Sequence, residues 1–201
     1  ILKTRAYSGL ADLYRASGDN GKALENYNQA LDLARSQDNP ELETELLGQI
    51  AKVYRDLEQF DQALAIADQI DNLAVKDDIL TDIAKIYRTA GQNDKALALY
   101  QQALALAETM NDPALQGATL TELGKVYRAM NQLEQALASY DQALKVEAQL
   151  DDPRLRALAL LEMGKTYRDL QQVDQALTHF QQARQTAQPL ADGSFDSAVL
   201  M

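Results

Sequence analysis

The chain has 201 residues, no cysteine, and 30 acidic against 19 basic residues, which gives a formal net charge of −11 at pH 7. The lack of cysteine excludes disulfides and thiolate metal sites. The excess of acid argues against bulk binding to DNA, RNA or anionic lipid, because such binding needs Lys and Arg to neutralise phosphates.

The chain contains no run of about 18 apolar residues, so we expect no membrane insertion. Its first residues do not resemble a signal peptide, and the lack of cysteine fits a reducing compartment. We therefore expect a cytoplasmic protein. Residue Ile1 lies in the middle of a sequence pattern, which favours a piece of a longer protein.

The dipeptide Tyr-Arg occurs five times, with its tyrosines at residues 14, 54, 87, 127 and 167. The intervals between these tyrosines are 40, 33, 40 and 40 residues. Self-similarity at a fixed period of this length is typical of stacked repeats, in which each unit completes its core with its neighbours. We expect one array over residues 1–188, with repeats at about 1–39, 40–74, 75–112, 113–152 and 153–188.

Within each repeat, apolar and small residues form two stripes at helical spacing, separated by a break after the Tyr-Arg dipeptide. The pattern predicts two antiparallel helices per repeat, here named helix A and helix B. From the first repeat to the fifth, the residues that carry it are Tyr7, Leu10, Ala11, Tyr14, Gly18, Ala23, Tyr27 and Ala30; Leu47, Ile50, Ala51, Tyr54, Ala63 and Ala67; Leu80, Ile83, Ala84, Tyr87, Gly91, Ala96 and Tyr100; Leu120, Leu123, Gly124, Tyr127, Ala136 and Tyr140; and Leu160, Met163, Gly164, Tyr167, Ala176 and Phe180.

The second repeat is shorter than the others, because the interval from Tyr54 to Tyr87 lacks seven residues, or about two helical turns. Ala67 also stands where the other repeats place Tyr or Phe. We expect a shorter hairpin after helix B of this repeat, with its turn near Asp71-Asn72 or Lys76-Asp77. A local notch or a change of superhelical pitch should accompany it.

The repeat pattern ends after Gln188, and residues 189–201 contain Pro189 and Gly193 followed by apolar residues. This segment is interpreted as a C-terminal tail or a partial cap over the last helix. A disordered segment and a remnant of a cloning vector are the alternatives.

The sequence offers little for catalysis or for binding a cofactor or a metal. Its one histidine, His179, lies beside the packing position Phe180, and no nucleophile and base stand at a usable spacing. The pairs Asp77-Asp78 and Asp151-Asp152 are interpreted as helix starts, where carboxylates cap free N–H groups. We predict no enzymatic activity, no cofactor and no metal site.

The order of large residue, Leu-Gly, Tyr, Gly, Ala, aromatic and Ala resembles the tetratricopeptide repeat family. The 40-residue interval, against the family's usual period of about 34, is similar to bacterial arrays attached to signalling or caspase-like effector domains and to kinesin-light-chain repeats. The resemblance covers residues 1 to about 188. It implies an all-α fold, a right-handed α-α superhelix of about five helix-turn-helix repeats that serves as a protein-binding scaffold.

The resemblance also implies that helix A lines a concave groove, through positions near the Tyr of the Tyr-Arg dipeptide. This residue is here called the signature Tyr. Two basic columns fall on these positions: Arg directly after Tyr in all five repeats, and Lys two residues before Tyr in four. Lys and Arg three residues apart share a helix face, and stacking nine of the 19 basic residues would focus a positive field in the groove. The predicted groove residues are Arg15, Lys52, Arg55, Lys85, Arg88, Lys125, Arg128, Lys165 and Arg168.

A structural role for these columns remains the alternative. Asp82, Glu122 and Glu162 each precede a column lysine by three residues, a spacing that stabilises a helix by about 0.2–0.5 kcal/mol. The arginines could bridge to a carboxylate of the adjacent helix A or pack their stems. Arg88 and Arg128 are the strongest ligand candidates, because no acid directly follows either.

We therefore predict a protein-interaction scaffold that binds an acidic peptide or protein patch. The alternative is a regulatory or sensor arm of a larger signalling protein. A single-stranded nucleic-acid binder is disfavoured by the net charge and by the lack of aromatics for base stacking. Self-association through an exposed terminal repeat is also possible. The sequence names neither the partner nor the pathway.

Overall fold

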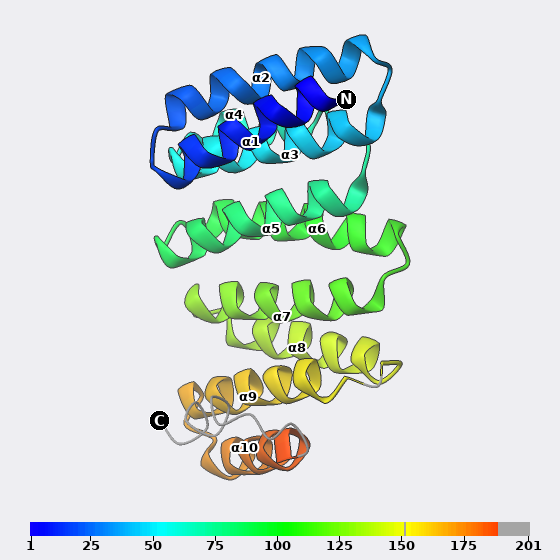
Figure 1. The fold of residues 1–201 in the computed structure, drawn as a ribbon. Coiled ribbons are helices and arrows are strands. Elements are labelled where there is room, and N and C mark those ends of the chain that lie inside the picture. The colour runs from blue at the N-terminus through cyan, green and yellow to red at the C-terminus, as the bar shows by residue number, and fades with distance from the viewer. Residues whose placement is uncertain (151, 189–201) are drawn as a thin grey trace. The chain divides into compact units, whose positions relative to one another are not determined.

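The computed structural model describes residues 1–150 and 152–188, and these residues form ten α-helices and no strand (Figure 1). The helices follow one another in five pairs, each of a first and a second helix. This confirms the predicted all-α repeat class. The pairs are α1 (Leu2–Ala16) with α2 (Asn20–Ser36), α3 (Pro40–Asp56) with α4 (Phe60–Ala67), α5 (Leu73–Thr89) with α6 (Asn93–Thr109), α7 (Pro113–Ala129) with α8 (Leu133–Glu147), and α9 (Pro153–Asp169) with α10 (Val173–Ala187).

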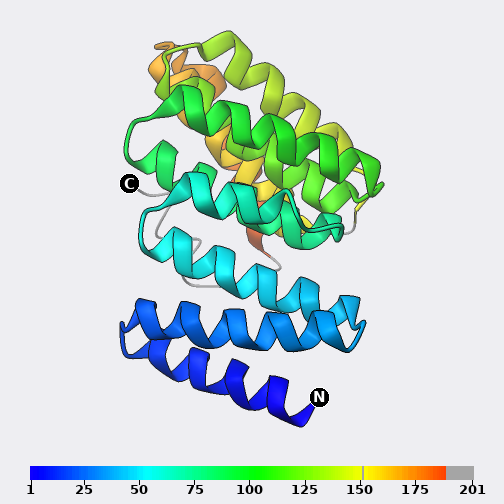
Figure 2. The ribbon, with the colours of Figure 1, turned by 90° about the horizontal axis from the view of Figure 1, so that it is seen from above.

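The chain divides into two compact units, residues 1–83 and the residues from 84 onward. In the first unit α1 and α2 lie antiparallel, as the dark and lighter blue helices of Figure 2 show. In the second unit α7 packs against α8 and α9 against α10 in the same manner. No helix in the described part of the chain is long and apolar enough to cross a membrane.

In three of the five pairs the first helix begins at a proline. Proline suits this position because its fixed φ fits the first helical turn and because the backbone N–H that it lacks would have no partner there. Asn39, Asp112 and Asp152 precede these prolines and accept hydrogen bonds from backbone N–H groups of the first turn. Asp152 therefore acts as the expected cap, whereas Asp151 lies outside the described residues. The tail at 189–201 lies outside them as well.

The expectation that Asp77-Asp78 starts a helix is wrong. The structure begins α5 at Leu73, and both aspartates lie within that helix. The side chain of Asn72 caps it instead, since its Oδ1 accepts from the Val75 backbone N–H at 3.1 Å. An Asn side chain caps a helix as well as a carboxylate does. The sequence alone therefore does not distinguish a helix start after Asn72 from one at Asp77-Asp78.

Each turn between a first and a second helix places one residue in the left-handed region, always four residues after the signature Tyr. The residue that follows it donates its N–H to the carbonyl of that Tyr, at 2.8–2.9 Å in all five turns. This bond satisfies a carbonyl that the end of the first helix leaves free. The left-handed residues are Gly18, Glu58, Gly91, Asn131 and Gln171, with φ between 57° and 82°.

The seven missing residues of the second repeat come out of its second helix. Helix α4 has 8 residues, whereas the other four second helices have 15 to 17. Helix α4 ends at Ala67 and α5 starts at Leu73. The turn therefore contains Asp71-Asn72, which is one of the two positions predicted for it.

The core of each repeat lies where its two helices cross. In the fourth repeat the ring of Tyr140, which is fully buried, packs directly on Gly124, and in the fifth Phe180 packs on Gly164. A Cβ at Gly124 would lie 2.3 Å from the Tyr140 ring, so the bare backbone is what admits the aromatic side chain. The aromatic residues of the second helices and the small residues of the first helices thus set the packing in these two repeats, as the periodicity predicts.

Candidate functional site

The arginine that follows each signature Tyr reaches the first helix of the next repeat. Its contact there is the residue five positions before the next signature Tyr, in every case where a next repeat exists. The four contacts are Arg15 with Gln49, Arg55 with Asp82, Arg88 with Glu122, and Arg128 with Glu162. We name this row of contacts, together with the lysines beside it, the arginine ladder.

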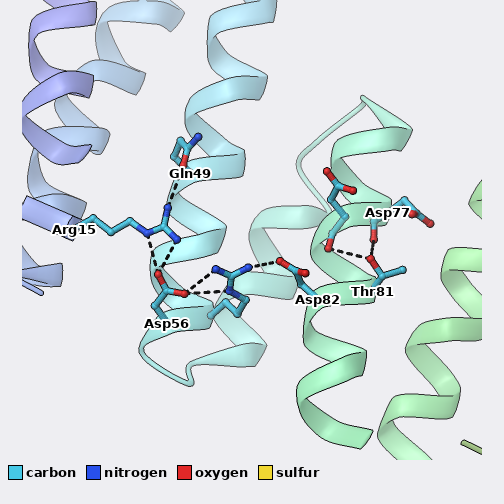
Figure 3. Close-up of polar contacts among 8 residues, drawn as sticks. Arg15, Gln49, Asp56, Asp77, Thr81 and Asp82 are labelled. Carbon is cyan, nitrogen blue, oxygen red and sulfur yellow. Dashed lines mark hydrogen bonds and ion pairs between the residues drawn. The ribbon is translucent and has the colours of Figure 1, made fainter. Parts of the chain in front are cut away.

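The ladder starts at Arg15, on the last turn of α1. Its Nε and Nη2 donate to Oδ2 of Asp56 at 2.9 and 2.8 Å, and its Nη1 donates to Gln49 at 3.4 Å (Figure 3). Asp56 and Gln49 both lie on α3. The ion pair therefore ties the first repeat to the second.

Arg55 lies between two carboxylates of the first unit. Its Nε and Nη2 donate to Asp56, and its Nη1 donates to Asp82 on α5. Burial alone would lower the pKa of Arg55, but the hydrogen bonds and charges of Asp56 and Asp82 raise it. Burial alone would raise the pKa of Asp56, but the hydrogen bonds and charges of Arg55 and Arg15 outweigh burial and lower this pKa. Both groups are held in their charged forms.

In the second unit the ladder acid is shared between an arginine and a lysine. Glu122 accepts from Lys125 at 2.5 Å through Oε1, and its Oε2 lies 3.5 Å from Nε of Arg88. Oε2 also accepts from the hydroxyl of Tyr100 at 3.4 Å. Burial first, and then the charge of Glu122, raises the pKa of Tyr100 to about 12.

Arg128 is the most fully paired arginine of the second unit. Its Nη1 donates to Glu162 at 3.3 Å and its Nε donates to Asp169 at 2.6 Å. Glu162 also accepts from Lys165 at 2.9 Å. Arg168, which has no following repeat among the described residues, has a half-exposed side chain and lies 3.9 Å from Asp169 of its own helix.

Two column lysines stand outside these pairs. Among the residues that the structure describes, neither Lys52 nor Lys85 has a carboxylate within ion-pair distance, although Asp82 precedes Lys85 by three residues. Asp82 faces Arg55 instead. Helical spacing therefore identifies a carboxylate within reach of a lysine but does not decide which cationic side chain forms an ion pair with it.

A hollow of about 480 Å³ opens along the ladder of the second unit. Four cationic side chains and two carboxylates border it, so the cations exceed the acids. The lining residues are Arg88, Lys125, Arg128, Ala129, Glu162, Lys165 and Asp169. The structure thus brings four of the nine predicted groove residues to one cavity.

The first unit has a hollow of different charge, about 520 Å³, between α3 and the start of α5. Lys52 is its one lining cation, whereas Glu41, Glu45 and Asp78 supply carboxylates. In this unit the predicted groove residue Lys52 therefore shares its surface with three acids.

Neither Arg88 nor Arg128 is directly followed by an acid along the chain. The acids that meet these arginines come from the following repeat, about 34 to 41 residues later. A signal for them does exist in the sequence. From the second repeat to the fifth, the position five before the signature Tyr reads Gln49, Asp82, Glu122 and Glu162, so it is acidic in the last three repeats.

His179 takes part in packing. Its ring lies 4.8 Å from that of Tyr167, centroid to centroid, and its Nδ1 donates to the Gln175 carbonyl at 2.8 Å. The described part of the chain holds no cluster of three or more His, Cys, Asp or Glu side chains that could bind a metal ion.

Sequence models of the tetratricopeptide repeat match this chain over residues 3–70, 77–147 and 121–192. The first model alone covers more than half of the chain. The chain belongs to the tetratricopeptide repeat family. This confirms the predicted family and gives the coarse function, since repeats of this type present extended concave surfaces to protein partners. No curated protein sequence matches the chain.

Several solved structures resemble it at low identity. BtubC (BKLC) from P. vanneervenii is 20% identical with a TM-score of 0.69, over 92% of this chain and 79% of that one. Aspartyl phosphate phosphatase F from Bacillus subtilis is 16% identical with a TM-score of 0.75, over 98% and 54%. A Signal Transduction ATPase with Numerous Domains, with a tetratricopeptide repeat sensor, from Pyrococcus horikoshii is 19% identical with a TM-score of 0.68, over 92% and 29%.

These likenesses show the fold alone. The chain spans about half the length of the phosphatase and less than a third of the ATPase.

Proposed function

We propose that this tetratricopeptide repeat chain binds an acidic peptide, or an acidic patch on a protein, along the first helices of its second unit. The observation that carries the proposal is the hollow at the ladder, where Arg88, Lys125, Arg128 and Lys165 face two carboxylates. A carboxylate-bearing ligand gains charge-assisted hydrogen bonds there. The guanidinium forks of the arginines suit that geometry.

The internal acids do not remove this capacity. The side chains of Arg88 and Glu122 are 24% and 26% exposed, and ion pairs that solvent reaches contribute about 0–1 kcal/mol each, so a ligand carboxylate can exchange with Glu122 at small cost. Arg88 has the longest ladder contact, 3.5 Å to Glu122, and Lys125 and Lys165 retain donors beyond the single acid that each contacts. The groove therefore keeps a net positive charge on a protein that is acidic overall.

The test is a binding titration with a short fluorescent polyglutamate peptide at low and moderate salt. We expect saturable binding that weakens as salt rises. The double variant Lys125→Gln, Lys165→Gln should weaken it about tenfold or more, which is about 1.4 kcal/mol. Glutamine keeps the side chain long and polar, so helicity measured by circular dichroism should not change.

A matched control uses lysines outside the ladder. Lys22→Gln with Lys145→Gln removes the same charge from exposed second-helix positions that pair with Asp19 and Asp141. The control should bind as the parent chain does. Equal loss in the control would mean that only net charge matters, and undiminished binding in the ladder variant would overturn the proposal.

A second candidate is a sensor or regulatory arm of a larger signalling protein. The likeness to a signalling ATPase with a tetratricopeptide repeat sensor favours it, because the chain matches only a 29% share of that protein. The complete reading frame decides between the two. An effector domain next to the array would support the sensor role, and its absence would oppose it.

A further inference from the structure

The outer face of α1 carries large apolar side chains that solvent reaches. Leu2 is 87% exposed, Leu10 is 46% exposed and Leu13 is 69% exposed. Leu10 and Leu13 lie four residues and one residue before the signature Tyr. They share one side of the helix, because residues three apart are neighbours on a helix surface.

In the second and fourth repeats the same two positions are buried on a helix that packs against the second helix of the preceding repeat. Ile50 and Val53 are 1% and 0% exposed on α3, which packs against α2. Leu123 and Val126 are 4% and 0% exposed on α7, which packs against α6. The face of α1 is therefore built to receive a second helix of the same type.

Helix α10, the last helix of the described residues, shows the complementary face. Val173 is 63% exposed and Leu177 is 53% exposed, and Phe180 is partly buried. Their equivalents one repeat earlier are Leu133, Leu137 and Tyr140, 40 residues before each. Leu133 is 9% exposed and Tyr140 is 0% exposed on α8, which packs against both α7 and α9.

The junction between α8 and α9 shows how two such faces fit. Met163, four residues before its signature Tyr, packs with Ala136 and Tyr140, and Leu137 lies against this cluster. Leu10 is the equivalent of Met163, and Leu177 and Phe180 are the equivalents of Leu137 and Tyr140. The apolar faces of α1 and α10 therefore have the composition and register of a junction that the chain already makes.

Charge also favours this pairing. Arg88 and Lys125 border one hollow, so within the second unit the arginine of one repeat and the lysine of the next line the same surface. The equivalent residues at the two ends are Arg168 and Asp12. The first repeat thus places an acid where the others place a lysine, and Arg168 has the most exposed side chain, 55%, of the five arginines that follow a signature Tyr.

We propose that copies of this chain associate head to tail, with α10 of one copy seated on α1 of the next. Leu177 and Phe180 of one copy pack against Leu10 and Leu13 of its neighbour, and Arg168 faces Asp12 across the junction. The interface joins two different surfaces, so it is heterologous, can add further copies, and does not close as a two-fold dimer.

The test blocks each end separately and uses the full chain. Leu13→Asp blocks the α1 face, and Leu177→Asp blocks the α10 face. Both residues are exposed, so both variants should stay helical. In analytical ultracentrifugation the parent should show a weight-average mass that rises with concentration, whereas each variant alone should remain at the protomer mass.

An equimolar mixture of the two variants distinguishes a head-to-tail contact from a symmetric one. Each retains one intact face, so the mixture should form a dimer of one copy of each and nothing larger. A blocked variant that still dimerises alone would mean a symmetric contact and would overturn the proposal. A parent that stays monomeric at every concentration would also overturn it and would leave an additional repeat of a longer chain as the occupant of the α1 face.

Discussion

Gly117 of α7 lies against the side chain of Glu147 of α8, so closely that a Cβ on Gly117 would be 2.8 Å from Cγ of Glu147. Glu147 lies 20 residues after its signature Tyr, where the repeats with full-length second helices carry Ala34, Ala107 and Ala187. Its side chain is 1% exposed, and neither of its carboxylate oxygens has a hydrogen-bond partner among the described residues. The fourth repeat thus buries an acid where its relatives bury a methyl group.

Burial makes the charged form of Glu147 costly. Burial first, and then the charge of Asp152, raises the pKa of Glu147 to about 7 from an ordinary 4.5, while Arg156 opposes the change. Between these two values the folded chain holds a proton that the unfolded chain has released. The contribution of Glu147 to the free energy of unfolding is therefore most favourable below pH 4.5, falls as pH rises to about 7, and stays low above it.

We expect Glu147→Ala to stabilise the protein at pH 8 by up to about 3 kcal/mol relative to the parent, and to stabilise it much less at pH 4.5. Urea unfolding of both chains across this pH range measures the difference. Glu147→Gln is the control, since it keeps the size of the side chain but does not titrate. A difference between parent and Glu147→Ala that does not vary with pH would contradict the assignment.

A second prediction concerns the contact between Gly117 and Glu147. Alanine at 117 alone should destabilise the fold by about 1–3 kcal/mol, because its Cβ meets a packed side chain. In the Glu147→Ala background the same change should be neutral or stabilising, since alanine favours a helix over glycine by about 1 kcal/mol. The double-mutant cycle measures this coupling. Additive effects of the two changes would mean that the two side chains do not compete for this space.

The sequence predicts the helix pairs, their order and the packing role of the tyrosines, because these depend on a period that is repeated five times. It does not predict which acid pairs with which arginine. That choice depends on side chains about 27 to 41 residues apart that the stacking of repeats brings together, as for Arg55 with Asp82 and Arg128 with Asp169. It also does not predict the burial of Glu147, since a glutamate near a helix end usually faces solvent.

A third prediction concerns the left-handed residue of each turn between paired helices. Gly91 has φ of +74° with no atom near its missing Cβ, so the cost of alanine there is conformational only. We expect Gly91→Ala to destabilise the protein by about 1 kcal/mol, and Glu58→Gly, at φ of 57°, to stabilise it by about 0.5 kcal/mol.

Gly9→Ala is the matched control for the turns, because Gly9 lies within α1 and its missing Cβ also has open space around it. Its effect should have the opposite sign to that of Gly91→Ala, since alanine favours a helix interior by about 1 kcal/mol. Thermal unfolding of the variants measures all three. Equal effects of Gly9→Ala and Gly91→Ala would show that the left-handed conformation is not what selects glycine at 91.

The last prediction separates the two roles of the arginine ladder at Glu162, which lies between Arg128 and Lys165 with a side chain only 7% exposed. Glu162→Gln keeps the shape but removes the charge that these two cations share. Breaking one member of a buried, paired set should destabilise the fold by about 1–3 kcal/mol. Gln49 occupies the equivalent place in the second repeat, so an amide fits there.

The same substitution raises the positive charge of the hollow by one unit. If the ladder also receives an acidic ligand, Glu162→Gln should bind the polyglutamate probe several-fold more tightly while it lowers stability, so the two measurements move in opposite directions. Glu134→Gln, at an exposed position of α8, is the control and should change neither measurement appreciably. Lower stability with unchanged or weaker probe binding would leave the ladder as a device that joins repeats, and the ligand would have to be sought on another surface.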